Sequence, residues 1–169
     1  MTNKILITGL PGSGKSTLIK RVVGRLNKPL TGFLTEEIRE KGRRVGFSIV
    51  TLGGKRGMLA HVKSKGTPRV GKYRVCLSDL EKIAVPSIIP ANPEVVVIVD
   101  EIGKMECFSP LFRKKIVEVL DSHPRVLATI ALHGNTFIEQ LKKRPDVEII
   151  RITHENRDDL VDIICSKFN

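Results

Sequence analysis

A glycine-rich stretch near the amino terminus, Gly9-Leu10-Pro11-Gly12-Ser13-Gly14-Lys15-Ser16-Thr17, decides the fold. It satisfies the pattern G-x(4)-G-K-[ST] of a phosphate-binding P-loop, also called the Walker A motif. The apolar run from Lys4 to Thr8 precedes it like a strand, and the apolar residues of 16–26 recur at helical spacing after it. The motif therefore lies between a strand and a helix, as phosphate binding by a P-loop requires.

The residue types in this loop suit a bound triphosphate. Glycines let the backbone turn where a Cβ would obstruct it, so that N–H groups face phosphate oxygens, and the helix N-terminus adds partial positive charge. We expect Lys15 to bridge the β- and γ-phosphates, which makes it both a binding and a catalytic residue. The Ser16 hydroxyl is expected to ligate Mg²⁺, and Thr17 to help hold the α-phosphate.

A second motif follows a strand-like run in the middle of the chain. Residues 95–99 are all β-branched, which is typical of a central parallel strand, and they lead into Asp100 and Glu101. An unpaired buried carboxylate costs several kcal/mol, so we expect Asp100 to find its partner in the Mg²⁺ shell, as a Walker B acid does. Ligands of open α/β sheets bind at the carboxyl ends of strands, where Gly9 and Asp100 both emerge.

Two further polar residues near these strand ends are candidates for catalysis. A carboxylate at Glu101 is placed to orient the attacking water or accept its proton, which favours hydrolysis over mere binding; the alternative is a surface acid with a local ion pair. Thr129 ends the run 126–130 and is a candidate for contact with the γ-phosphate or the water. Ordinary strand propensity explains Thr129 nearly as well.

Positive charge for the transition state has two candidates in the sequence. Lys104 and Arg69 are each placed to act as a finger, a cation from the same chain that contacts the transferred phosphate. The alternative for each is a solvated surface cation.

The segment 153–157 follows the last strand, where contacts to base or ribose are one interpretation. The favoured interpretation is that Thr153 caps the last helix.

The order of strand-like and helix-like segments along the rest of the chain predicts an α/β fold. Short β-rich pieces separated by turn signals indicate antiparallel hairpins inserted after the first helix, over about 31–77. Ser78 is expected to cap a helix that Pro86 limits. Helices and strands then alternate, which implies a mostly parallel sheet covered by helices on both faces. They are expected at 109–121 (helix), 126–130 (strand), 136–143 (helix), 147–152 (strand) and 155–168 (helix).

Length and composition favour one domain over residues 1–169, since about 150 residues suffice for a single core. The sequence has no secretory signal pattern and no apolar run that approaches the roughly 20 residues of a membrane span. We therefore expect a cytoplasmic protein without a membrane partner.

The formal charge of +11 raises the question of a nucleic-acid partner. The basic residues are spread over 39–44, 63–74, 113–115 and 142–144, with one Tyr and no Trp to stack on bases. A positive field also attracts a polyanionic nucleotide, so nucleic-acid binding is possible but not favoured.

With its motifs placed, the chain resembles the small nucleoside-triphosphatase family of thermophilic archaea and bacteria, whose animal relatives include the cancer-related nucleoside-triphosphatase. The resemblance runs in order along nearly the whole chain. Its matching stretches are 9–17, Gly32-Phe-Leu-Thr-Glu-Glu-Ile-Arg39, Arg44-Val-Gly-Phe47, Val70-Gly-Lys-Tyr73, Asp100-Glu-Ile-Gly-Lys-Met-Glu106 and Glu155-Asn-Arg157. The stretch Ala131-Leu-His-Gly134 departs from the family pattern.

This resemblance implies a RecA-like P-loop fold, a three-layer sandwich with an inserted β region. It also implies Mg²⁺-dependent hydrolysis of ATP, GTP, CTP and UTP to the diphosphate and phosphate. The family's nucleotide-binding segments carry over onto the P-loop and onto Val96, Val97, Ile98, Val99, Asp100, Glu101, Ile102 and Gly103.

Three alternatives stay open. A nucleotide or nucleoside kinase uses the same P-loop and Mg²⁺ but needs an acceptor pocket and a basic lid, for which the stretch 55–74 is a candidate. A regulatory GTPase is disfavoured because the sequence lacks the guanine-reading pattern Asn-Lys-x-Asp. A nucleic-acid-associated ATPase module is suggested by charge alone.

Overall fold

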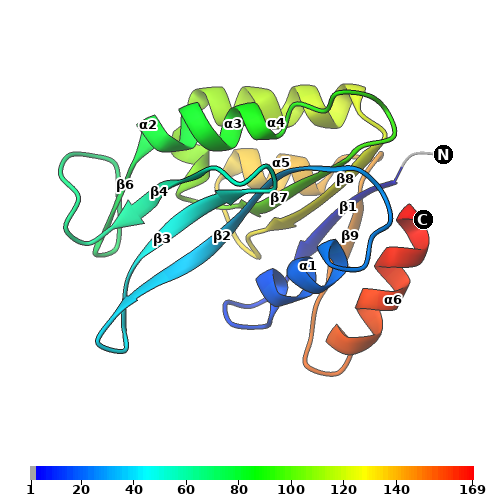
Figure 1. The fold of residues 1–169 in the computed structure, drawn as a ribbon, viewed down its shortest axis with the longest axis horizontal. Helices are drawn as coiled ribbons and strands as arrows, with labels where there is room; N and C mark the ends of the chain where they lie inside the picture. Colours follow the sequence, from blue (N-terminus) through cyan, green and yellow to red (C-terminus); the bar gives the residue numbers. More distant parts are fainter. Residues whose placement is uncertain (1–2) are drawn as a thin grey trace.

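The computed structural model describes residues 3–169, and its backbone is organised around a continuous sheet with the strand order β5-β6-β4-β3-β2-β7-β8-β1-β9 (Figure 1). The strands are β1 (Asn3–Thr8), β2 (Leu30–Glu40), β3 (Arg43–Thr51), β4 (Arg56–His61), β5 (Arg69–Val70), β6 (Tyr73–Val75), β7 (Val96–Ile102), β8 (Arg125–Ile130) and β9 (Glu148–Arg151).

Helices begin where the sequence supplies a cap or a permissive first turn. Ser109 accepts a hydrogen bond from Phe112 N at 3.0 Å before α4, and Asn135 accepts one from Ile138 N at 3.0 Å before α5. The helical segments are α1 (Lys15–Val23), α2 (Leu77–Asp79), the π-helical turn η1 (Leu80–Ala84), α3 (Val85–Ser87), the 3₁₀ turn η2 (Glu106–Phe108), α4 (Pro110–Ser122), α5 (Thr136–Lys142) and α6 (Arg157–Phe168).

The strands β2, β7, β8, β1 and β9 run parallel and are covered by helices on both faces (Figure 1). Successive side chains of a strand point to opposite faces. Ile5 and Ile7 therefore pack with α1 and α6, while Leu6 packs with η1, α3, α4 and α5 on the other face. The predicted α/β sandwich is confirmed.

The predicted antiparallel hairpins are also confirmed, and they extend the central sheet. β2 pairs in parallel with β7, with Phe33 opposite Val99, and antiparallel with β3. Gly32 makes this junction possible: its φ is 117°, and a Cβ there would lie 1.8 Å from the Ile98 carbonyl oxygen. The β-rich stretch is thus anchored directly to the strand that carries Asp100.

The helical segment after this β region differs from the prediction at both ends. Ser78 lies inside α2, and Cys76 occupies the N-cap position without a side-chain cap bond. The segment also continues past Pro86 to Ser87. Because hydrogen bonding changes from π to α type at Ala84–Val85, Pro86 falls in a first turn, where a missing N–H costs little. No helix of residues 3–169 is long and apolar enough to cross a membrane.

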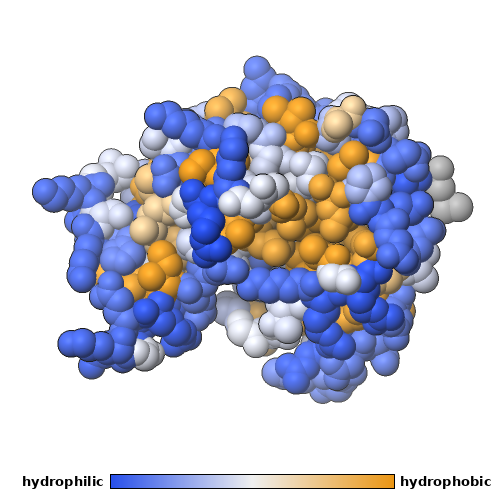
Figure 2. All heavy atoms as spheres, viewed as in Figure 1, coloured by the Kyte–Doolittle hydropathy of each residue, from blue (hydrophilic) through white to orange (hydrophobic). Residues whose placement is uncertain are grey.

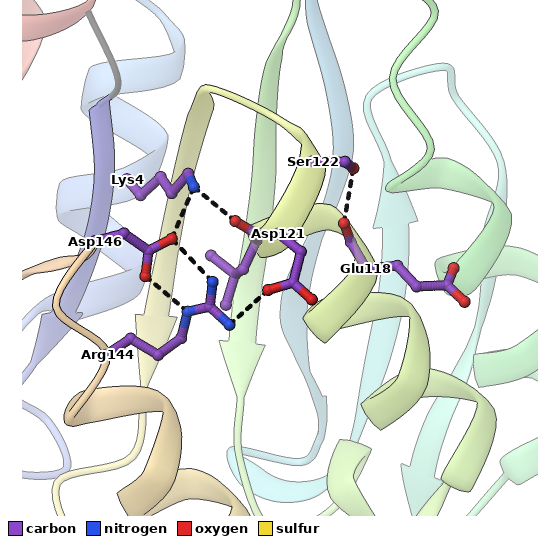
Figure 3. Close-up of polar contacts among 7 residues, drawn as sticks. Lys4, Glu118, Asp121, Ser122, Arg144 and Asp146 are labelled. Atoms are coloured by element: carbon purple, nitrogen blue, oxygen red, sulfur yellow. Dashed lines mark hydrogen bonds and ion pairs between the residues drawn. The ribbon is translucent and has the colours of Figure 1, made fainter.

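A charged network closes the end of the sheet opposite the P-loop (Figure 3). Lys4 is 8% exposed and donates from Nζ to the Leu120 carbonyl at 2.6 Å and to Asp146 Oδ2 at 2.8 Å. Arg144 donates to both oxygens of Asp146 and pairs with Asp121. The bonds from Arg144, with the one from Lys4, hold the pKa of Asp146 well below its usual range. The network joins β1, the end of α4 and the segment after α5.

We predict that Asp146→Asn destabilises the fold by about 1–2 kcal/mol at pH 7, less than for a fully buried pair because the side chain of Asp146 is 34% exposed. Because the pKa of Asp146 is lowered in the folded protein, this stabilisation is present when the pH is above about 3.9, the pKa of aspartate in the unfolded chain. It is lost as the pH falls from there towards the folded pKa. Urea unfolding at pH 7 and pH 3 measures the difference, which should shrink at pH 3.

The matched control is Asp162→Asn, since the carboxylate of Asp162 pairs with Arg25 on the surface and is 72% exposed. Its effect should stay within about 0.5 kcal/mol at both pH values. If the effect of Asp146→Asn on stability is the same at pH 7 and pH 3, the pKa of Asp146 is not lowered in the folded protein.

Candidate functional site

The P-loop connects β1 to α1 in a form that leaves backbone donors free for an anion. Gly12 and Gly14 have φ of 76° and 100°, where a side chain would be strained. Gly14 occupies the N-cap position of α1, and no side chain caps the helix there. The Lys15 amino group folds back and donates to the Gly9 carbonyl at 3.1 Å. The first N–H groups of α1 and the amino group of Lys15 are thus gathered at the P-loop. Together they are donors suited to a phosphate group.

The carboxylate of Asp100 joins three elements at the carboxyl end of the parallel strands. It is fully buried, and its Oδ1 accepts hydrogen bonds from Ser16 Oγ at 3.2 Å and Thr129 Oγ1 at 2.7 Å. Burial raises the pKa of Asp100, and the two hydroxyl bonds oppose that rise. These contacts link β7 to α1 and to β8.

The oxygens at this junction fit a magnesium ion bound together with phosphate. Asp100 Oδ2 is buried and has no hydrogen-bond partner within residues 3–169, so one carboxylate oxygen is available beside the Ser16 hydroxyl. No group of three or more His, Cys, Asp or Glu side chains in that range forms a metal site. Mg²⁺ commonly needs only one or two protein oxygens, because phosphates and water complete its shell.

Two more carboxyl groups lie around the turn after Asp100. Glu101 borders the cavity described below; burial raises its pKa, and the charge of Lys15 opposes that rise. Glu106 is only 4% exposed and accepts a hydrogen bond from Gly103 N at 3.2 Å. Burial, with the charge of Glu101, raises the pKa of Glu106 well above its usual range. A Cβ at Gly103 would lie 2.6 Å from Glu101 Oε1 and 3.0 Å from Glu106 Oε2, so a side chain there would push one of these carboxyl groups aside.

A cavity of about 640 Å³ opens beside the P-loop, a size suited to a nucleotide-sized ligand. Figure 2 shows it as the notch between the β2–β3 hairpin and the loop. P-loop residues and Glu101 form one wall. The other walls come from distant parts of the chain and are lined by Glu37, Arg44, Phe47 and residues 131–133.

The structure brings Lys15, Ser16, Asp100 and Glu101 together, but not every predicted site residue reaches the cavity. Thr129 is completely buried and contacts Asp100, so its hydroxyl positions that carboxylate. The strand residues are buried in the two core clusters and do not line the cavity, because the sheet places their side chains under the helices. These residues are Val96, Val97, Ile98, Val99 and Ile102.

The two cations predicted as fingers also lie elsewhere. Lys104 is exposed in the turn after β7, and Arg69 lies on β5 at the edge of the sheet; neither lines the cavity. The arginine that does line it is Arg44, which sequence reasoning missed along with Glu37 and Phe47. All three fall within stretches that carry the family resemblance, which was the one available signal.

Two smaller hollows lie along the P-loop beside the last helix. One, of about 200 Å³, is bordered by residues 10–13 and 151–155; the other, of about 280 Å³, includes Arg157 and Arg21. Thr153 and Asn156 exchange hydrogen bonds between their side chains and backbone N–H groups just before α6. The N-cap position of α6 is Asn156, without a side-chain cap bond, so the prediction that Thr153 caps this helix is wrong; its hydroxyl accepts from Asn156 N in the turn before the helix.

The known proteins that this chain resembles are nucleoside-triphosphatases. The sequence model of a family described as NTPase matches residues 4–165. The chain is 48% identical to nucleoside-triphosphatase THEP1 of Thermotoga sp. (strain RQ2), covering 98% of this chain and 97% of the relative. It is 38% identical to the human cancer-related nucleoside-triphosphatase, over 95% and 94% of the two chains. The crystal structure of THEP1 from Aquifex aeolicus superposes with a TM-score of 0.90 at 37% identity, covering 98% of this chain and 99% of that one.

We predict that Glu106→Gln stabilises the fold increasingly as pH rises. Glutamine keeps an acceptor for Gly103 N and carries no charge. Because the folded pKa of Glu106 is raised, the stability that its carboxyl contributes is present below the unfolded value of about 4.3 and is lost as pH rises through the folded pKa. The advantage of the variant, measured by urea unfolding, should be near zero at pH 4 and larger at pH 8.

A suitable control is Glu94→Gln, because the carboxylate of Glu94 is 66% exposed and pairs with Arg125 at the surface. This control should change stability by less than about 0.5 kcal/mol across the same range. A Glu106→Gln advantage that is the same at pH 4 and pH 8 would mean that Glu106 is ionised in the folded protein.

Proposed function

The chain belongs to the NTPase family of nucleoside-triphosphatases, and we propose that its P-loop site hydrolyses ATP, GTP, CTP and UTP to the diphosphate and phosphate with Mg²⁺. The observation that carries the proposal is the junction at Asp100. A buried carboxylate with one free oxygen lies against the P-loop serine, next to a second acid that borders the cavity. A phosphate-binding module alone has no use for that second acid.

Binding is the work of the P-loop in this proposal. The triphosphate displaces the Lys15 amino group from the Gly9 carbonyl, and the freed ammonium group then pairs with the β- and γ-phosphates. Ser16 and Asp100 are the residues that would hold Mg²⁺, which would neutralise phosphate charge when bound. Thr129 keeps Asp100 oriented through its 2.7 Å hydrogen bond.

Hydrolysis is assigned to Glu101. A water oxygen forms a bond to the γ-phosphorus while the bond from that phosphorus to the β–γ bridging oxygen breaks. Glu101 accepts the proton that the water loses. Its raised pKa supports this role, because a general base works best when its pKa approaches the working pH.

Broad base selectivity is supported by the residues at the far side of the P-loop. The hollows there are bordered by Arg157, Arg21 and the segment 151–155. A guanidinium group offers a stacking surface to any base, whereas discrimination needs side chains matched to one base edge. We therefore assign the base to this side and expect weak preference among the four nucleotides.

A kinase is supported less well. A kinase would use the basic stretch 55–74 as a lid. Here that stretch instead forms β4, β5 and most of β6 at the edge of the sheet. β3 and β2 separate these strands from β7. A stretch held by strand pairing at this distance is poorly placed to close over the P-loop.

A nucleic-acid-stimulated activity is the second candidate. It is favoured because most of the net positive charge of the chain lies in one segment, although the basic clusters are scattered along the sequence. Residues 31–77 carry eleven Lys and Arg against three Glu, a net +8 of the chain's +11. In the folded chain this segment is one half of the sheet. If that half binds nucleic acid, RNA should stimulate phosphate release, and the stimulation should fall steeply between about 50 and 200 mM salt. Equal rates with and without RNA exclude this candidate.

The direct test of hydrolysis is phosphate release from each of the four triphosphates with Mg²⁺ and no added acceptor. We expect release from all four and loss of release when the divalent ion is chelated. A protein that binds the nucleotides but releases phosphate only when an acceptor is added would be a kinase.

The assignment of Glu101 predicts that Glu101→Gln binds a non-hydrolysable triphosphate with nearly unchanged affinity but turns over on the order of 10²-fold more slowly. Binding calorimetry and steady-state kinetics separate the two effects. Glu36→Gln is the matched control, because Glu36 pairs with Arg56 outside the cavity. Turnover of Glu101→Gln close to that of the control would remove Glu101 from the mechanism.

A further inference from the structure

We propose that Arg44 is a catalytic arginine finger supplied by the same chain, which contacts the γ-phosphoryl group as it is transferred to water. This inference rests on the proposed function, since it assigns one further residue to the same hydrolysis. Arg44 lies on β3, 28 residues after Ser16 in the sequence, yet it lines the same cavity as Lys15 and Glu101. Apart from the family resemblance over 44–47, no pattern in the sequence near Arg44 marks it as part of a phosphate site.

The guanidinium group of Arg44 is held in place by three neighbouring side chains. Its Nε donates to Tyr73 Oη at 2.9 Å, and its Nη1 donates to Glu37 Oε1 at 3.2 Å. The group also lies over the ring of Phe47, with its central carbon 5.1 Å from the ring centroid. These contacts fix the orientation of a long side chain that would otherwise lose conformational freedom on contacting a ligand.

The same contacts leave the group able to bind an anion. Its Nη2 has no hydrogen-bond partner among the described residues 3–169, and 44% of the side chain is exposed. Glu37 does not neutralise Arg44 alone, because its Oε2 also accepts two bonds from Arg39. A partly paired arginine with a free terminal nitrogen at a cavity wall is suited to a charged oxygen that approaches from the cavity.

The position of Arg44 complements the P-loop lysine. Lys15 lies on the P-loop wall, and Arg44 lies on the wall formed by the β2–β3 hairpin. A γ-phosphate between these walls meets one cation from each side while Glu101 faces the water. Charge that develops on the γ-phosphoryl oxygens in the transition state is then stabilised by a group already oriented toward it.

The hairpin is tied to the chemistry through the sheet. β2 carries Glu37 and pairs with β7 up to Phe33 opposite Val99, the residue before Asp100. β3 carries Arg44 and is paired with β2 along its length. Arg44 lies opposite Arg39, six residues beyond Phe33 and past an irregularity at Ile38/Arg39, so the β2–β3 hairpin, anchored to β7 at its base, sets the placement of the arginine relative to Asp100.

The test compares Arg44→Ala and Arg44→Lys with Arg43→Ala, an exposed neighbour on β3 that does not line the cavity. We expect Arg44→Ala to lower kcat by a factor on the order of 10²–10³ while the Kd of a non-hydrolysable triphosphate changes by less than about threefold. Arg44→Lys should lose at least about tenfold in kcat, since an ammonium group lacks the planar fork. Arg43→Ala should behave as the wild type.

Binding of a transition-state mimic separates a catalytic role of Arg44 from a purely structural one. Wild-type protein should bind the nucleoside diphosphate with aluminium fluoride and Mg²⁺, and Arg44→Ala should lose this complex while still binding the diphosphate alone. Added guanidinium should restore part of the turnover of Arg44→Ala. Tyr73→Phe, which keeps the ring but removes the acceptor of Arg44 Nε, should lower kcat by a smaller factor.

Three results would overturn the inference. They are a wild-type kcat in Arg44→Ala, a loss of kcat matched by an equal loss of triphosphate affinity, and an aluminium fluoride complex that still forms with Arg44→Ala. Failure of the proposed function is separate, because it would appear as absence of phosphate release by the wild type. Hydrolysis by the wild type with unchanged turnover in Arg44→Ala rejects only the role of Arg44.

Discussion

The buried carboxylate of Asp100 is the constraint around which the site is organised. A carboxylate excluded from water must be hydrogen-bonded, and here the hydroxyls of Ser16 and Thr129 meet one of its oxygens. Those two bonds fix the first turn of α1 and the end of β8 relative to β7. The other oxygen, Oδ2, has no hydrogen-bond partner among residues 3–169, and a cation is a partner that would offset its burial. The P-loop and the proposed metal site are therefore parts of one arrangement.

The antiparallel half of the sheet completes this arrangement from a distance. β2 pairs with β7 on one side and β3 on the other, and Gly32 permits the close approach. The pairing carries Glu37, Arg44 and Phe47 to the wall that faces the P-loop. A region that looks like an insertion in the sequence thus supplies one side of the cavity, with an arginine that faces the P-loop lysine across it.

The features that sequence reasoning found are those written in short, local patterns. The P-loop and the pair Asp100-Glu101 follow buried strands, and the carboxyl ends of parallel strands necessarily meet. The role of Arg44 was not predictable in this way, because it depends on antiparallel register across β2 and β3. Charge alone pointed to Lys104 and Arg69, which strand pairing and exposure place elsewhere. Glu106 was also missed, since a motif does not show which acid the turn will bury.

The most direct test of this account is the gain in nucleotide affinity that Mg²⁺ provides, measured by calorimetry with a non-hydrolysable triphosphate for wild type and Asp100→Asn. Asparagine is nearly the same size but lacks the charge. The account predicts that Mg²⁺ tightens binding at least about tenfold in the wild type, or roughly 1.4 kcal/mol, and that the variant loses this gain while binding the metal-free nucleotide as before. An undiminished gain in Asp100→Asn would contradict the central role of Asp100.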